Sequence, residues 1–306
     1  MEFLSYLISG ISLGSVYAII ALGYTMVYGI AKMLNFAHGD VIMIGGYISF
    51  CGMMYLGLNG WIALILAMAV CTILGIIVEG LAYRPLRQAT SLAVLITAIG
   101  VSYLLQNLAL YITGGLNKNY PSIPWISDRI TVLGMETTRV TVITPFLTIL
   151  LVVLLVLLIN HTKIGMAMRA VSLDFEVSQL MGIKINNVIS ATFIIGTFLA
   201  AIGSVLFFTN YPGVVPTSGA MPGLKAFVAA VFGGIGSIPG AVIGAFIIGI
   251  AESLIKGLDT ILIVNGTITE QIGLATFSDA FTFVLLIIIL VFKPTGLFGE
   301  KATDKV

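Results

Sequence analysis

The sequence predicts an all-α polytopic membrane protein with about eight to ten transmembrane crossings, some of them made by discontinuous helices. Only 9% of the 306 residues are charged, against roughly 25% in a soluble domain, and 59% are hydrophobic. The 14 Lys and Arg and 13 Asp and Glu residues are also clustered, with long uncharged runs between the clusters. This composition excludes a soluble enzyme, a disordered chain and a basic nucleic-acid-binding protein.

The uncharged runs give the helices in order, because a helix needs about 20 apolar residues to cross roughly 30 Å of hydrocarbon. The first run, 3–31, follows no basic region and is too long for a signal-peptide core, so we expect a retained helix. The run 41–78 fits two helices separated by a turn at Asn59-Gly60. Continuous runs favour helices over a β-barrel. The later spans are expected within 92–112, 140–159, 185–224, 223–236, 241–262 and 279–292.

Basic residues predict the orientation of the chain. Arg84 and Arg87 lie in one polar connection, and three more basic residues lie in the connection 160–187. Two crossings separate these connections, so they share one side, which the positive-inside rule places in the cytoplasm. The connection 113–139 is expected on the opposite side, and the tail returns to the cytoplasm if three crossings follow the loop 211–222. The side of the N-terminus stays open.

Two glycine-rich segments, 35–40 and 233–240, interrupt the apolar runs. Polar groups at membrane depth usually face a bundle interior, and glycines let backbones approach each other. Paired interruptions of this kind in the two halves of a chain indicate a transport pathway and are typical of inverted-repeat permease cores. We expect the two segments to lie close together. The candidate pathway residues are Asn35, His38, Gly39, Asp40, Gly233, Gly234, Gly236, Ser237 and Pro239.

Simpler roles are open for several of these residues. A single glycine more often serves close helix packing, as expected for Gly10 and Gly14. A hydrogen-bonded structural role is the commoner one for His38, and with one further histidine in the chain no metal site is expected. Asp40 can cap a helix that begins at Val41.

Two acidic residues, Glu79 and Glu252, end apolar runs. The favoured interpretation places each near a membrane interface, either hydrated or paired with a cation such as Arg84 or Lys256.

The connection 160–187 is too polar for lipid and too regular for a loop. It predicts one amphipathic helix that ends at Gly182 and either lies on the membrane or docks into another protein. Its apolar face consists of Met168, Val171, Phe175 and Leu180.

The sequence has no P-loop, no nucleophile elbow, no His-Glu-x-x-His motif and no chain of membrane-embedded acids for a proton relay. The chain is therefore not expected to be an enzyme, and active transport would need an energy source on another subunit.

Four stretches together resemble one known family. The residues 14–40, 169–183, 229–241 and 293–299, in this order, are similar to the signatures of branched-chain amino-acid ABC importer permeases of the LivH type. The resemblance covers nearly the whole chain.

The resemblance implies a single permease domain, 1–306, in a bacterial cytoplasmic (inner) membrane. It implies three kinds of protein partner besides lipid, and no nucleic acid: a second homologous permease, two cytoplasmic P-loop ATPases, and an extracytoplasmic binding protein that delivers leucine, isoleucine or valine. ATP would be bound by the ATPases, with no cofactor in this chain. The connection 160–187 would couple the ATPases to the membrane helices through Arg169, Ala170, Asp174, Phe175, Glu176, Leu180, Met181 and Gly182.

Alternatives to this function remain. Related permeases move urea or short amides, and an ion-coupled secondary transporter or a channel would work without ATPases. A membrane scaffold or enzyme is the remotest class. The resemblance also leaves open whether the two permeases are identical.

Overall fold

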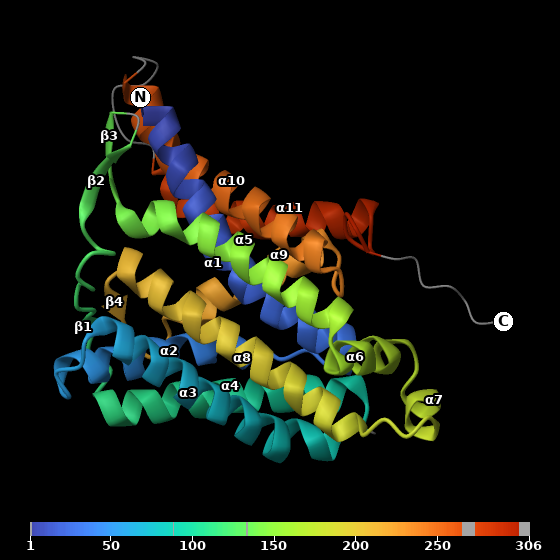
Figure 1. The fold of residues 1–306 in the computed structure, drawn as a ribbon. Coiled ribbons are helices and arrows are strands. Elements are labelled where there is room, and N and C mark those ends of the chain that lie inside the picture. Colours follow the sequence, from blue (N-terminus) through green and yellow to red (C-terminus); the bar gives the residue numbers. More distant parts are fainter. Residues whose placement is uncertain (1, 88, 133, 265–272, 300–306) are drawn as a thin grey trace.

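The computed structural model describes residues 2–87, 89–132, 134–264 and 273–299, and these residues are predominantly helical (Figure 1). The helices are α1 (Glu2–Ala31), α2 (His38–Met54), α3 (Gly60–Val78), α4 (Ser91–Thr113), α5 (Arg139–His161), α6 (Lys163–Leu173), α7 (Phe175–Leu180), α8 (Ile185–Asn210), α9 (Ala220–Gly233), α10 (Ile238–Val264) and α11 (Ser278–Phe292). The short elements are the π-turn η1 (Glu79–Tyr83), the 3-10 turns η2 (Arg84–Leu86) and η3 (Leu274–Phe277), and the strands β1 (Lys118–Asn119), β2 (Arg129–Val132), β3 (Met135–Thr138) and β4 (Gly213–Val214).

Seven helices among the described residues are long and apolar enough to cross a membrane, which confirms the predicted class of an all-α polytopic membrane protein. They are α1, α3 with its two following turns, α4, α5, α8, α10 and α11. The helices α2 and α9 have only 17 and 14 residues, and one lies in each half of the chain. The turn at Asn59-Gly60 is confirmed, because the Asn59 side chain accepts a hydrogen bond from the Trp61 amide and caps α3.

The first helix forms the centre of the fold, with α5, α8, α9 and α10 packed around it (Figure 1). Small residues permit the close crossing of α1 and α10. A Cβ atom added at Gly14 would lie 2.9 Å from the Ala245 carbonyl oxygen, and one at Gly10 would lie 2.8 Å from the Ile250 Cα. The predicted packing role of these two glycines is therefore confirmed.

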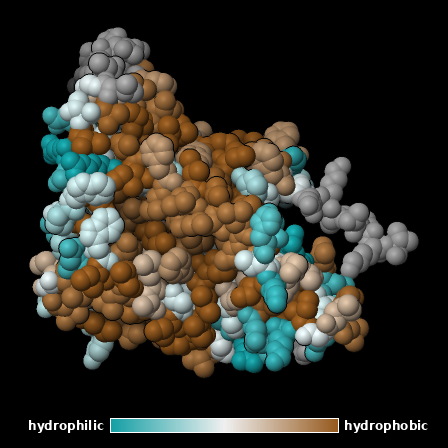
Figure 2. Space-filling model, in the orientation of Figure 1, coloured by the Kyte–Doolittle hydropathy of each residue, from teal (hydrophilic) through white to brown (hydrophobic). Residues whose placement is uncertain are grey.

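The two ends of the molecule carry the connections as predicted. Arg87 hydrogen-bonds Asn186, so the connection after α3 lies beside the connection between α5 and α8. At the opposite end, Lys118 of β1 pairs with Val214 of β4, which places 113–139 next to the loop after α8. Figure 2 shows hydrophilic residues gathered at these two ends, with hydrophobic residues between them.

The structure also shows on which side α1 begins and α11 ends, which the charge pattern left undetermined. Ala31, the last residue of α1, lines a cavity with Arg84 and Lys184, so α1 ends on the predicted cytoplasmic side and begins on the other side. The helix α11 ends on the side of the molecule on which α6 and α7 lie (Figure 1). Residues 300–306 of the tail lie outside the described residues.

Candidate translocation and coupling site

The first interrupted segment connects α1 to α2 and is held by a buried hydrogen bond. The Asn35 side chain is 4% exposed, and its oxygen accepts a hydrogen bond from the Tyr83 hydroxyl at 2.8 Å. His38, also buried, packs edge-on against Tyr24 with 4.7 Å between ring centroids. The side chains of Asn35 and His38 are thus held in place where the chain passes from α1 into α2.

Asp40 does not have the capping role considered for it. The helix α2 begins at His38, so Asp40 lies within its first turn, and no side chain caps this helix end. The Asp40 side chain is buried and its Oδ1 accepts a hydrogen bond from Gln106 Nε2 at 2.8 Å. It therefore binds α4 to the start of α2.

The start of α2 touches the start of α9. A Cβ atom added at Gly39 would lie 2.8 Å from the Gly219 carbonyl oxygen and 3.3 Å from the Gly223 Cα. Only glycine allows this approach of two backbones. The two short helices thus meet with their N-terminal turns inside the bundle, so Gly39 faces α9 rather than the second interrupted segment.

The second interrupted segment is packed against the end of the chain. The amides of Leu297 and Phe298 donate to the carbonyls of Phe232 and Gly233, each at 2.9 Å. A Cβ atom at Gly234 would lie 2.4 Å from the Gly299 nitrogen, so this glycine is needed for that contact.

Ser237 and Pro239 start a helix rather than bend one. The Ser237 hydroxyl accepts a hydrogen bond from the Gly240 amide at 3.3 Å, at the beginning of α10. Pro239 is the second residue of α10. Pro239 fits here without a kink, because the first turn of a helix does not use the missing N–H.

The two interrupted segments converge at their edges. A cavity of about 10 Å³ lies between them, near the middle of α9. Gly236 also lies against α1, since a Cβ atom at Gly29 would be 3.2 Å from the Gly236 Cα. A cavity of this size holds about one water molecule, so no amino acid passes here in this conformation. The residues lining it are Tyr24, Tyr28, Met33, Leu34, Asn35, Phe227, Ala230 and Ile235.

The cytoplasmic connection contains two helices, not the single helix that was predicted. The chain breaks at Asp174, whose Oδ1 accepts hydrogen bonds from the amides of Glu176 and Val177 at 3.0 and 3.1 Å and caps α7. Gly182 adopts a positive φ of 83° after α7, which confirms the predicted stop.

The break separates the predicted apolar face. Met168 and Val171 on α6 are buried, whereas Leu180 is 86% exposed and Met181 is 78% exposed. Periodicity alone could not reveal this, because an Asp within an amphipathic pattern also fits the polar face of one continuous helix. The Arg169 side chain is exposed and donates a hydrogen bond to the Asn160 carbonyl. Ala170, the next residue, is half-buried.

A large open cavity adjoins α7. Its volume is about 840 Å³, and it lies between the last turn of α1, the turn η2, α7 and the start of α8. Phe175, Glu176 and Gly182 of the predicted coupling segment line it, together with Arg84 and Arg87.

Glu79 joins this cavity to the membrane helices. Its buried carboxylate forms an ion pair with Arg87 and accepts a hydrogen bond from Ser190 Oγ at 2.7 Å. The prediction that a cation neutralises Glu79 is confirmed, but the cation is Arg87 rather than Arg84. The π-turn η1 begins at Glu79 and ends at Tyr83, the donor to Asn35. The start of α8 and the first interrupted segment are therefore both attached to one turn.

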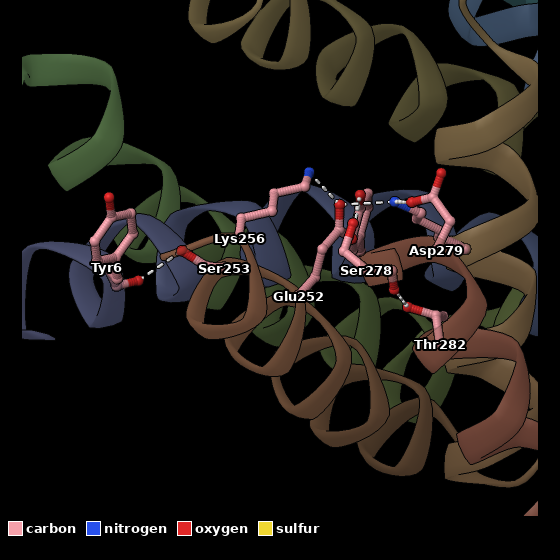
Figure 3. A network of polar contacts seen from close by, with 9 residues as sticks. Tyr6, Glu252, Ser253, Lys256, Ser278, Asp279 and Thr282 are labelled. Atoms are coloured by element: carbon pink, nitrogen blue, oxygen red, sulfur yellow. Dashed lines mark hydrogen bonds and ion pairs between the residues drawn. The ribbon is translucent and has the colours of Figure 1, made fainter. Parts of the chain in front are cut away.

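A second charged cluster brings together side chains of α10 and α11 (Figure 3). The Glu252 carboxylate, 1% exposed, accepts from Lys225 Nζ at 2.7 Å, from Lys256 Nζ at 2.5 Å and from the Tyr17 hydroxyl at 3.0 Å. Lys225 also pairs with Asp279 at 2.5 Å. The expected pairing of Glu252 with Lys256 is confirmed. Lys225 was missed, although a lone lysine between two long uncharged runs is the signal that could have identified it.

Among the described residues, no three His, Cys, Asp or Glu side chains gather in a way that could hold a metal ion. In the Glu252 cluster, Lys225 and Lys256 already pair with the carboxylate that a metal ion would need.

Among the described residues, seven apolar helices packed with two short, touching helices define a polytopic helical membrane protein. The sequence comparison identifies the family: residues 6–290 match the model described as branched-chain amino acid transport system / permease component, so the chain belongs to this family of permeases.

The relatives of this chain extend over its whole length. It is 39% identical over 317 residues to the high-affinity branched-chain amino acid transport system permease protein LivH of Escherichia coli strain K12, covering 100% of this chain and 98% of that protein. It is 38% identical over 316 residues to the corresponding permease protein BraD of Pseudomonas aeruginosa, with the same coverage. Among solved structures, PsaBC from Streptococcus pneumoniae in complex with Fab matches with a TM-score of 0.49 and 14% identity, over 97% of this chain and 94% of that chain.

Proposed function

We propose that this chain is the transmembrane permease subunit of an ATP-driven importer for leucine, isoleucine and valine in a bacterial cytoplasmic membrane. The observation that carries this proposal is the full-length similarity to LivH and BraD, both named for high-affinity transport of branched-chain amino acids. The family itself consists of permease components, which are transport subunits rather than enzymes.

The energy comes from two cytoplasmic ATPases, because no P-loop occurs in this sequence. ATP is thus bound by these partners and not by this chain, which needs no cofactor. A second, similar permease and an extracytoplasmic binding protein complete the importer.

The connection 160–187 is the docking segment for one ATPase within a single permease domain. Leu180 and Met181 support this role, because they are exposed at the end of α7, which adjoins the cavity lined by Arg84 and Arg87. Their burial in a groove of the ATPase would offset the cost of exposing them to water. The cap at Asp174 and the stop at Gly182 hold α7 in place, with Arg169 before it on α6 and Glu176 in its first turn.

The translocation pathway runs beside the two interrupted segments. The glycine contact between α2 and α9 supports this, because small backbone movements there displace two whole helices. Asn35, His38 and Asp40 anchor the α2 side of the pathway, and residues 233–239 anchor the side of α10.

Uptake by the reconstituted importer tests this function. Proteoliposomes containing the assembled transporter and its loaded binding protein should accumulate radiolabelled leucine only with internal ATP. Unlabelled isoleucine and valine should compete, whereas urea and acetamide should not. Uptake that follows an ion gradient without ATP would identify a secondary transporter, and competition by urea or acetamide alone would identify the amide-transporting alternative.

A further inference from the structure

The open cavity beside α7 carries charges that the fold leaves unpaired. Its volume of about 840 Å³ is typical of small-molecule binding sites. Arg84, Glu176 and Lys184 line it and are exposed, and none of them forms an ion pair within the part of the chain that the structure describes. Their charges are therefore available to a ligand.

Arg87, which also lines this cavity, keeps one unused hydrogen-bond donor. Its two terminal nitrogens bind Asn186 and Glu79. Its Nε atom is buried and has no hydrogen-bond partner among the described residues. Buried polar groups are nearly always hydrogen-bonded, so this donor indicates an acceptor oxygen that another molecule supplies.

The balance of charge in the cavity favours an anion. Glu79 already neutralises Arg87, and the remaining cations, Arg84 and Lys184, outnumber the one acid, Glu176. Guanidinium and ammonium groups are the side chains that bind phosphate most strongly, and the fork of an arginine matches two phosphate oxygens. The cavity is therefore composed for a phosphate group.

An apolar stripe leads from the membrane to this cavity. Ile73, Ile77 and Leu81 follow one another at intervals of four residues and are 56%, 48% and 77% exposed, along the continuous span Gly60–Leu86. Arg84 comes three residues after Leu81, where this stripe ends. A lipid whose acyl chain lies along the stripe would place its headgroup beside Arg84.

We propose that the cavity binds the phosphate headgroup of an anionic membrane lipid through Arg84, Arg87 and Lys184. Basic pockets at the cytoplasmic ends of membrane helices are suited to such headgroups. Arg84 belongs to η2 and Lys184 immediately precedes α8, so one headgroup would join two elements that the hydrogen bond from Arg87 to Asn186 also joins. The inference goes beyond the proposed function and does not depend on it.

Native mass spectrometry of the purified transporter, titrated with phosphatidylglycerol, tests this site. One cation near the headgroup contributes about 1 kcal/mol, so Arg84→Gln and Lys184→Gln should each weaken binding of the first phosphatidylglycerol about fivefold. The matched control is Lys163→Gln, an exposed lysine of the same connection that does not line the cavity, and it should bind as wild type does. Phosphatidylcholine, which has no net charge, should bind more weakly and be insensitive to all three substitutions.

The same spectra distinguish the other occupants of the cavity. Equal phosphatidylglycerol binding by Arg84→Gln, Lys184→Gln and Lys163→Gln overturns the proposal. Loss of the ATPase from the first two variants, with lipid binding unchanged, also overturns it and assigns these cations to the ATPase. Inorganic phosphate that displaces the lipid at equal concentration would show that a free anion is bound instead. A wild-type chain that purifies without any ATPase would contradict the proposed function, while its lipid binding would still decide this inference.

Discussion

The Tyr83 hydroxyl donates a hydrogen bond to the Asn35 side-chain oxygen, 2.8 Å away, across 48 residues of sequence. This bond attaches the interrupted segment between α1 and α2 to the π-turn after α3. The same turn begins with Glu79, which binds Arg87 and Ser190. A π-turn is an irregularity that often occurs at functional sites, and here it connects the start of α8, next to the coupling segment, with the candidate pathway.

Removal of the Tyr83 hydroxyl should weaken transport without unfolding the protein. In Tyr83→Phe the ring keeps its packing on Phe193, at 5.2 Å between centroids, but Asn35 loses its partner in a buried site. An unsatisfied buried polar group costs about 1–3 kcal/mol. We expect a several-fold lower ratio of leucine transported to ATP hydrolysed, with normal membrane insertion. Tyr111→Phe, at an 88% exposed tyrosine, is the control and should behave as wild type. An unchanged ratio in Tyr83→Phe would show that this bond carries no coupling.

The cap at Asp174 should matter through its hydrogen bonds rather than its charge. Loss of an N-cap costs about 0.5–2 kcal/mol, and asparagine caps about as well as aspartate. We therefore expect Asp174→Ala to lower substrate-stimulated ATPase activity and uptake together, and Asp174→Asn to retain both. Asp128→Ala, at an exposed aspartate in the connection 113–139 at the opposite end, is the matched control and should keep both activities. If Asp174→Asn is as defective as Asp174→Ala, the carboxylate charge contacts the ATPase directly.

The two aspartates show what sequence patterns could and could not predict. Long uncharged runs placed the membrane helices well, because lipid demands an apolar segment of fixed length whatever its neighbours. A cap depends instead on where a helix begins, which tertiary packing decides. Asp40 was considered as a cap and lies within α2, while Asp174 caps α7 inside a segment predicted as one helix. The partner of Glu79 could not be predicted either, because the irregular turns after α3 direct Arg87 rather than Arg84 toward it.

The exposed Leu180 should be needed for ATPase binding. We expect Leu180→Glu to reduce copurification of the ATPase, because a charge would be buried in a contact that otherwise holds a leucine. Leu116→Glu provides the control, since Leu116 is 68% exposed at the opposite end of the molecule. The chain itself should stay folded in both variants, because neither leucine supports its core. Equal ATPase content in the two purified complexes would place the docking surface elsewhere.

The Lys225–Glu252 pair should show strong energetic coupling. Both side chains are almost fully buried, so removal of one partner leaves an uncompensated charge, at a cost of about 3–5 kcal/mol. We expect Lys225→Met and Glu252→Gln each to lower the thermal unfolding midpoint of the purified protein clearly.

The double variant decides whether this cost belongs to the pair. With both charges removed, it should be destabilised by less than the sum of the single variants, with an interaction energy of about 1–3 kcal/mol. Lys256→Met is the control, because the Lys256 side chain is 43% exposed and its ion pair should contribute about 0–1 kcal/mol. Strict additivity of the two single variants would show that Lys225 and Glu252 are each stabilised by other groups, with Asp279 the partner of Lys225 and Tyr17 and Lys256 the partners of Glu252.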